Sequence, residues 1–420
     1  MGADMRSFIA IVAAATSVAA FVPLFQHRAS AIEAQKAGLV GSSTPALPKK
    51  PAVPAGPPPL AGIEIEKFVV HDDEVIAPAV AGRTAHLSID PDLQRASAKI
   101  LRQYAFPEAA VVVLETAGAR VLAWASHVEK GPSRDLCVEA TAPAASIFKI
   151  VTGAALVETA GVAPDVKQCY SGGESRITAL DLVEDPRRDR WCATLGEAMG
   201  RSLNTVFARL ALKNLTPADL AGMGGAFGFG DPVPFDVPVA ASSLYIPEDK
   251  LGFARTAAGF WNTTMSPLEA ATIANTVANQ GEVLRPVIVE SVADATGNLY
   301  QAPKRTVIRR AIHPETAAAL TSMMETTIRG GTSYRAFHDA EGRAFLPNIT
   351  IAGKTGTLTR AETQQFYTWF VGFAPSRAPE VAIAVLVVNT PSWRAKANVV
   401  AREVLRAYFA AKGVPGVTRP

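Results

Sequence analysis

The sequence predicts an α+β fold in which one sheet is assembled from both ends of the chain around a helical middle part. Two strand-like runs, 109–116 and 120–126, are joined by a short Ala-Gly-Ala turn, which is a hairpin signal. An Ala/Leu-rich stretch with helical periodicity follows, from about residue 142 to residue 320. Tight hairpins favour antiparallel pairing. Three more strand-like runs lie near the C-terminus, at 348–357, 365–374 and 380–389.

The N-terminus is uncharged and apolar over Ser7–Phe25, which is long enough to cross a hydrocarbon core of about 30 Å. We expect an uncleaved single-pass membrane anchor. One alternative is a signal peptide cleaved after the Ala-Ser-Ala sequence at 29–31, and the other is a buried helix of a soluble domain. Arg6 lies on one side of the segment and His27 and Arg28 on the other, so charge does not fix its orientation.

A Pro/Ala/Gly-rich stretch, 41–60, follows this segment and predicts a semi-extended tether, because it can bury little apolar surface. With 49% hydrophobic and 19% charged residues, most of the 420-residue chain is expected to fold. The predicted division is a membrane or signal segment 1–28, a linker 29–62, a short N-terminal region 63–107, a catalytic domain 108–412 and a tail 413–420.

The remaining elements are placed by local signals. Residues 61–80 predict one or two strands, and residues 90–104 a helix with Asp90 at its N-cap and a proline at its first position. A final helix is expected over 396–412. The Gly/Pro-rich segment 228–247 is either part of a substrate groove or a surface loop.

The sequence Gly353-Lys354-Thr355-Gly356-Thr357 has two interpretations. A nucleotide-binding P-loop requires a glycine at position 348, where the chain has Asn348, and a helix after Thr355. The flanking residues are instead strand-like. The alternative is the K-T-G strand of enzymes that acylate a serine, and it needs a nucleophile elsewhere in the chain.

The chain supplies that nucleophile in the expected order. An S-x-x-K sequence holds Ser146 and Lys149, an S-x-N sequence holds Ser202 and Asn204, and the K-T-G strand follows. Each motif alone also fits ordinary structure: a chance helical spacing, helix caps, or a turn. Their common order favours chemistry.

The residue types suit acyl transfer. Lys149 lies one helical turn from Ser146 and can accept its proton as a neutral amine, whose pKa burial and the nearby Lys354 would lower. Ser202 can relay a proton to the leaving amine, and Asn204 can hold a substrate amide. The strand 354–357 can pair with an extended peptide, and its Lys and Thr side chains suit a terminal carboxylate.

Three cysteines are present. If the body of the protein is exported, Cys169 and Cys192 can form a disulfide that leaves Cys137 free. The alternatives are three reduced thiols or, less favoured, a metal site, for which the chain offers no C-x-x-C sequence.

With these motifs the chain resembles the penicillin-binding proteins, the D,D-transpeptidases that cross-link peptidoglycan, from about residue 81 to residue 410. The resemblance implies a five-stranded antiparallel sheet flanked by helices, with an all-helical subdomain. Supporting segments are 87–96, 109–126, 263–289 and 328–337.

The resemblance also implies roles. Ser146 would be the acylated nucleophile, Lys149 the base, and Ser202, Asn204 and Lys354 further catalytic residues. Thr355, Gly356 and Thr357 would bind substrate, and the backbone N–H groups of Ser146 and Thr357 would form the oxyanion hole. No metal or cofactor is needed.

The implied partners are peptidoglycan stem peptides, β-lactam inhibitors, the membrane and a cell-wall synthesis complex involved in cell shape, with no nucleic acid. The implied location is the inner membrane, with the catalytic domain on its extracytoplasmic side, or a cleaved secreted form. D,D-carboxypeptidase activity would use the same site.

Two features of the chain differ from the family pattern, and two alternative functions stay open. Ala144-Ala145 stand where the family usually has Pro-Gly before the nucleophile, and residues 26–86 leave no room for a glycosyltransferase domain and little for a long pedestal. The rivals are a class D-like β-lactamase or β-lactam sensor domain, and a non-catalytic scaffold that binds cell-wall peptides.

Overall fold

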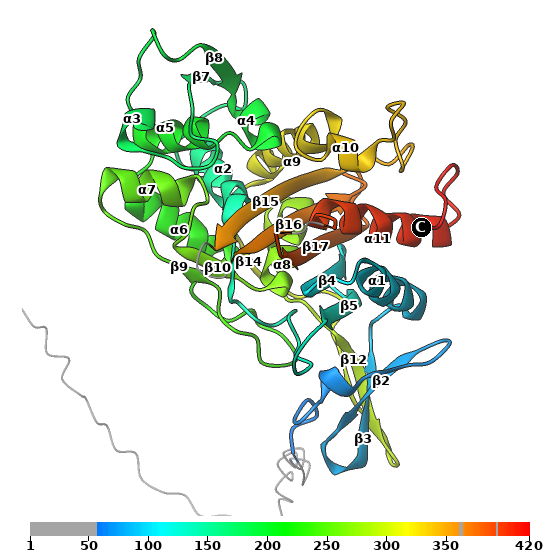
Figure 1. Ribbon diagram of the computed structural model, residues 1–420. Helices are drawn as coiled ribbons and strands as arrows, with labels where there is room; N and C mark the ends of the chain where they lie inside the picture. The colour runs from blue at the N-terminus through cyan, green and yellow to red at the C-terminus, as the bar shows by residue number, and fades with distance from the viewer. Residues whose placement is uncertain (1–56, 361–363, 392–393) are drawn as a thin grey trace, which may run out of the picture. The chain divides into compact units, whose positions relative to one another are not determined.

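A computed structural model describes residues 57–360, 364–391 and 394–420. Its main feature is a five-stranded antiparallel sheet in the order β15-β16-β17-β4-β5, so strands from both ends of the sequence lie side by side (Figure 1). The prediction of one sheet built from both chain ends is confirmed. Its strands are β4 (Glu108–Glu115), β5 (Val121–Val128), β15 (Ala352–Arg360), β16 (Gln365–Ala374) and β17 (Val381–Asn389).

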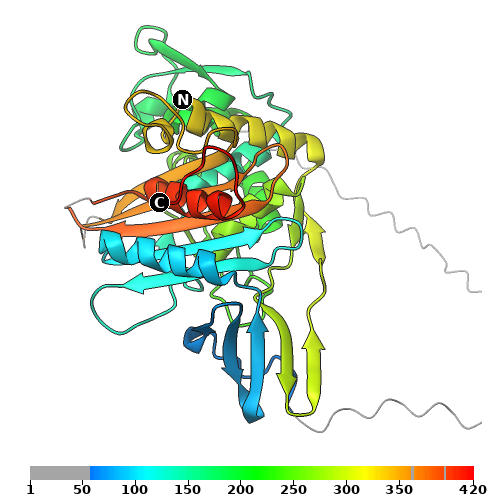
Figure 2. The same cartoon turned by 90° about the vertical axis from the view of Figure 1, so that its right-hand side faces the viewer.

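Helices cover both faces of this sheet, which explains why its central strand β17 is buried along its whole length. Helices α1 (Pro91–Tyr104) and α11 (Ala397–Ala411) pack on one face, as Figure 2 shows from the side, and α8 (Pro267–Ala278) packs on the other. The predicted N-cap is present, since Asp90 accepts a hydrogen bond from the Leu93 N–H at 2.8 Å.

The middle part of the chain is less uniformly helical than the sequence predicted. Short strands interrupt it because Gly/Pro-rich loops and β-branched runs break the helical pattern. Its helices are α2 (Lys149–Glu158), α3 (Ala179–Leu182), α4 (Leu195–Arg201), α5 (Asn204–Asn214), α6 (Pro217–Phe227), α7 (Lys250–Ala257), α9 (Pro314–Arg329) and α10 (Tyr334–Phe337). Its short strands are β6 (Ala142–Pro143), β7 (Lys167–Tyr170), β8 (Trp191–Thr194), β9 (Ser243–Leu244), β10 (Thr263–Met265), β11 (Glu282–Leu284) and β14 (Val307–Arg310).

A second five-stranded sheet was not predicted. Three strands come from the N-terminal region and two from a segment some 200 residues later, paired through β3 and β12 (Figure 1). The predicted N-terminal region 63–107 therefore shares its sheet with residues 289–301. The strands are β1 (Val69–Val70), β2 (Val75–Ala79), β3 (Arg83–Leu87), β12 (Val289–Asp294) and β13 (Gly297–Gln301).

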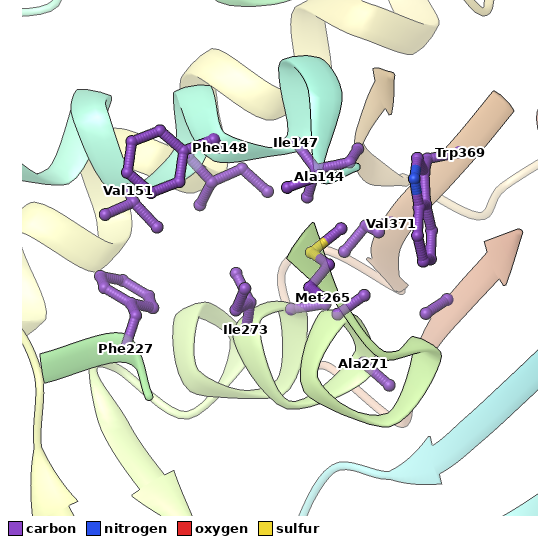
Figure 3. Close-up of a cluster of buried hydrophobic side chains, with 14 of the residues drawn as sticks. Ala144, Ile147, Phe148, Val151, Phe227, Met265, Ala271, Ile273, Trp369 and Val371 are labelled. Atoms are coloured by element: carbon purple, nitrogen blue, oxygen red, sulfur yellow. The ribbon is translucent and has the colours of Figure 1, made fainter. Parts of the chain in front are cut away.

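The larger hydrophobic core lies between α2, α8 and the main sheet (Figure 3). In this view Ile147, Phe148 and Val151 face Ile273 of α8, with Trp369 of β16 beside them. All five side chains are buried. The turn that carries Ser146 is thereby anchored on both sides by apolar packing.

The segment 228–247 is a structural brace. Its Asp236 is buried, pairs with Arg285 at 2.7 Å, and accepts hydrogen bonds from the Ile288 and Val289 N–H groups. Strand β9 in the same segment pairs with β10, which in turn pairs with β6 directly before Ser146. This segment therefore supports the nucleophile turn from outside.

The predicted membrane segment, 7–25, and most of the predicted linker lie outside the described residues. Within the described ranges, no helix combines the length and apolar character that a membrane crossing needs.

Candidate active site

Ser146 lies in the 3-10 turn Ala145–Phe148, immediately before α2. Two hydrogen bonds fix the chain that leads into it: the Ala144 N–H donates to the Thr263 carbonyl at 3.1 Å, and the Trp369 indole donates to the Pro143 carbonyl at 2.9 Å. Ala145 has φ of +50°. That conformation costs an alanine roughly 1 kcal/mol, which explains why the related family usually places glycine there.

Lys149 is the partner of Ser146, as the spacing predicted. Its Nζ lies 2.8 Å from Ser146 Oγ and also donates to the Ala258 carbonyl. The side chain is fully buried. Burial lowers the pKa of Lys149 well below its usual range, and the charge of Lys354 lowers it further. The neutral amine that a general base requires is thereby favoured.

Ser202 and Lys354 form a second pair. Lys354 Nζ donates to Ser202 Oγ at 2.9 Å and to the Thr355 carbonyl at 2.7 Å. Burial lowers the pKa of Lys354 to about 7. Ser202 ends α4 in the left-handed region, with φ of +58°, so it is a C-cap residue and not the N-cap that an ordinary structural interpretation suggested.

Asn204, which is predicted to hold a substrate amide, lines the cleft and also contacts the base. Its Oδ1 accepts a hydrogen bond from Lys149 Nζ at 2.7 Å, and its Nδ2 donates to the Gly173 and Glu174 carbonyls at 2.9 and 2.8 Å. Both ends of the amide thus have a partner within the protein, and Oδ1 keeps a second lone pair that can accept a hydrogen bond. Asn204 orients the lysine and fastens a neighbouring loop.

The K-T-G residues lie on β15, an edge strand of the main sheet, and this placement fits a strand and not a P-loop. A Cβ at Gly356 would lie 3.2 Å from Ile147 and 3.3 Å from the Ala145 Cβ, so glycine lets β15 approach the nucleophile turn. The Thr355 hydroxyl hydrogen-bonds to Thr332 Oγ1 at 2.6 Å.

These groups border a cleft of about 550 Å³. The sequence motifs missed several of its residues, because they carry no motif of their own. Thr332 alone could have been found, since it lies in the family-like segment 328–337. The predicted residues that line the cleft are Ser146, Ser202, Asn204, Thr355, Gly356 and Thr357; those missed include Glu174, Trp261, Thr332, Trp369, Lys396 and Asn398.

The structure joins Cys169 to Cys192 by a disulfide between β7 and β8. The loop that it closes contains Gly173 and Glu174, the partners of Asn204. Cys137 is free and buried, and burial raises the pKa of its thiol well above the usual range, so it is unreactive by position.

A hydroxyl beside a buried amine, a second lysine–serine pair and an edge strand within one cleft define a serine acyl-transfer site. Comparison with known proteins identifies the family. The chain belongs to the penicillin-binding protein transpeptidase domain family, whose sequence model matches residues 109–410.

Curated relatives include the peptidoglycan D,D-transpeptidase PbpA of Mycobacterium tuberculosis H37Rv, 29% identical over 73% of this chain and 68% of the relative. Another is the peptidoglycan D,D-transpeptidase MrdA of Haemophilus influenzae, 24% identical over 79% of this chain and 57% of the relative.

Solved structures agree. A crystal structure of PBPA from M. tuberculosis matches with a TM-score of 0.66 and 26% identity, over 78% of this chain and 83% of that one. The imipenem acyl-enzyme complex of penicillin-binding protein A from M. tuberculosis matches with a TM-score of 0.65 and 27% identity, over 78% and 80% of the two chains.

Proposed function

We propose that the chain is a peptidoglycan D,D-transpeptidase that forms an acyl-enzyme at Ser146 with stem peptides ending in D-Ala-D-Ala. The observation that carries this proposal is the position of the buried Lys149 amine, 2.8 Å from Ser146 Oγ. The acyl-enzyme complexes of penicillin-binding protein A from M. tuberculosis support it by similarity.

Acylation begins when Ser146 Oγ attacks the carbonyl of the penultimate D-Ala. Lys149, as a neutral amine, takes the hydroxyl proton as the C–O bond forms. The negative charge that develops on the carbonyl oxygen is stabilised by the backbone N–H groups of Ser146 and Thr357. These groups come from the nucleophile turn and from β15, which approach each other closely because Gly356 has no side chain.

Collapse of the tetrahedral intermediate breaks the C–N bond, and the departing D-Ala nitrogen needs a proton. Ser202 lies next to Lys354 and can pass a proton through its hydroxyl. The terminal carboxylate of the substrate would be held by Thr355, Thr357 and the charge of Lys354. The amine of a second stem peptide then attacks the ester and restores Ser146, and water in its place gives D,D-carboxypeptidase activity.

The protein would act on the extracytoplasmic side of the membrane, held there by its N-terminal apolar segment. The Cys169–Cys192 disulfide supports an oxidising compartment, because such bonds are rare in the cytosol. Extraction of the protein by detergent tests its attachment to the membrane. Its accessibility to protease added to intact cells tests the side of the membrane on which it lies.

The test of the reaction separates the transpeptidase from a β-lactamase. With a chromogenic β-lactam, we expect one equivalent of product in a burst and then negligible turnover. With a D-Ala-D-Ala pentapeptide, we expect release of D-Ala. Steady β-lactam turnover without D-Ala release would establish the β-lactamase instead.

A further inference from the structure

One edge of the main sheet borders a second groove. Strand β5 is the edge opposite β15, and it lies beside α1 (Figure 1). The groove has a volume of about 990 Å³ and shares no lining residue with the cleft that holds Ser146. Its lining residues come from β5, α1, residues 65–70 of the N-terminal region and residues 133–135. The acyl-transfer steps leave this groove without a role.

Alternate residues of β5 point their backbone N–H and C=O groups away from β4, as in any antiparallel pair. Trp124 is one of them, because its N–H donates to Gln94 Oε1 at 2.8 Å and its carbonyl accepts from Gln94 Nε2 at 2.9 Å. Ser126 and Val128 follow at the same spacing, so their backbone groups point the same way. No hydrogen bond to these outward groups is present in the part of the chain that the structure describes.

The Gln94 side chain shows what this edge accepts. Its amide offers one acceptor and one donor to Trp124, as a residue of a neighbouring strand would. The edge is therefore closed at Trp124 and open at Ser126 and Val128. Ser126 is exposed. An open strand edge with free donors and acceptors binds an extended segment of another chain by strand addition.

Helix α1 runs along β5 in the same direction. At its start, the Asp90 N–H donates to the Leu122 carbonyl at 3.0 Å. Four residues later Gln94 meets Trp124, which is two residues further along β5. A helix rises about 6 Å over four residues and a strand about 6.6 Å over two, so the two elements stay in step.

Two basic side chains of α1 therefore lie beside the open part of the edge. Lys99 and Arg102 lie about 7.5 and 12 Å beyond Gln94 along the helix. On β5, Ser126 and Val128 lie about 7 and 13 Å beyond the partner of Gln94. Both basic side chains are exposed and line the groove. Neither of them makes a hydrogen bond or an ion pair with a residue of the described ranges.

The other charges of the groove are mostly satisfied within the protein. Arg95 and Arg134 are paired with carboxylates, and Asp135 accepts a hydrogen bond from an indole N–H at 2.8 Å. Among the remaining charged residues that line the groove in the described ranges, only Glu66, on the N-terminal wall, has no such partner. The free charge along α1 is basic, and it attracts an acidic partner.

We propose that the outer edge of β5 is a docking site for an extended, acidic segment of a partner protein, which adds a strand to the main sheet. The backbone of the segment pairs with Ser126 and Val128, and its carboxylates lie against Lys99 and Arg102. A second copy of the chain fits this edge less well. Antiparallel pairing of β5 with its copy would set both α1 helices on the same face of the sheet, where their basic side chains repel each other.

The experiment measures peptide binding to the full-length protein by fluorescence anisotropy. The probe is a labelled peptide of sequence Thr-Val-Glu-Val-Glu-Val-Thr, which places both Glu side chains on one face of a strand. One control peptide has Lys in place of Glu, and another has methylated backbone nitrogens that cannot pair with a strand edge. Wild type is compared with the double variant Lys99→Glu, Arg102→Glu. A matched double variant, Lys250→Glu, Lys304→Glu, makes the same charge change at exposed positions outside the groove.

We expect wild type to bind the acidic peptide about tenfold or more tightly than either control peptide. The double variant at Lys99 and Arg102 should bind it about tenfold more weakly, and the matched variant should bind it like wild type. Hydrogen exchange of the Ser126 and Val128 N–H groups should slow when the acidic peptide is bound. Labelling of Ser146 by penicillin should be unchanged in every variant, which shows that the variants are folded.

The docking site is overturned if the acidic peptide does not bind wild type at concentrations up to about 1 mM. Equal binding of the methylated peptide, or unchanged exchange at Ser126 and Val128, would overturn it as well. If wild type alone dimerises and its Ser126 and Val128 N–H groups become protected as protein concentration rises, the edge belongs to a second copy of the chain and the acidic partner is excluded.

Discussion

Asn204 Oδ1 accepts a hydrogen bond from Lys149 Nζ at 2.7 Å, so this residue of the S-x-N sequence contacts the base and not the nucleophile. A neutral amide at this position leaves the pKa of Lys149 low. A carboxylate of the same shape would favour the charged lysine and raise its pKa. The relationship makes Asn204 a sensitive position for the pH dependence of acylation.

Asn204→Asp is therefore expected to slow acylation by about tenfold or more at pH 7 and to move the rising limb of the pH–rate profile to higher pH. The measurement is the second-order rate of penicillin acylation from pH 5 to pH 10. Asn298→Asp, on the remote strand β13, serves as the control. An unmoved profile in Asn204→Asp would refute the role of this contact.

Lys149→Met removes the base and keeps most of the side-chain volume. We expect acylation of Ser146 to fall by about 10²- to 10⁴-fold, the usual contribution of a positioned base. The melting temperature should not fall, because a fully buried amine is costly to desolvate. Stopped-flow kinetics measure the acylation rate, and thermal unfolding measures the melting temperature. An acylation rate within tenfold of that of wild type would exclude Lys149 as the base.

Glu269 gives a stability prediction. It is buried on α8, its Oε1 has no hydrogen-bond partner in the described structure, and burial raises its pKa to about 8. The unfolded carboxyl titrates near pH 4.3, so the folded state holds one more proton between these values. Its contribution to stability is fully present below about pH 4.3 and is lost as pH rises to about 8.

Glu269→Gln replaces the titrating carboxyl group with an amide that does not titrate. The free energy of unfolding of the variant, taken relative to that of wild type, should be higher at pH 8 than at pH 5. Urea unfolding midpoints at both pH values measure it. The exposed Glu315→Gln should show no such difference. An equal wild-type-minus-variant difference at both pH values would mean that Glu269 is ionised in the fold.

The Cys169–Cys192 disulfide closes a loop with a sequence separation of 23 residues. Replacing both cysteines by serine should lower the free energy of unfolding by roughly 3 kcal/mol. Because the loop holds the carbonyl partners of Asn204, acylation should slow several-fold as well. Denaturant unfolding and acylation rates measure both effects; a Cys137→Ala variant tests whether any cysteine change does the same.

Much of the fold could be predicted from local sequence. The sheet strands β4, β5, β16 and β17 are long apolar runs, and Asp90 with the following proline marks the start of α1. The second sheet could not be predicted, because the pairing of β3 with β12 joins residues 200 positions apart. Short strands such as β6 and β10 exist only through their tertiary partners.

The candidate site could likewise be predicted only in part. Ser146 and Lys149 are neighbours on one helical turn, so their spacing alone predicts the contact. The contacts of Asn204 Nδ2 depend on a loop 30 residues away, and its Oδ1 contacts Lys149, 55 residues away, so neither was visible in the sequence. Trp261 and Glu174 enter the cleft through loop geometry, which no motif records.

The most direct test of the acyl-enzyme mechanism is covalent labelling with a fluorescent penicillin, followed by peptide mapping. Wild type and Ser133→Ala, an exposed serine outside the cleft, should be labelled at Ser146 to one equivalent, and Ser146→Ala should remain unlabelled although folded. Equal labelling of Ser146→Ala and wild type, or an adduct mapped to another residue, would contradict the account.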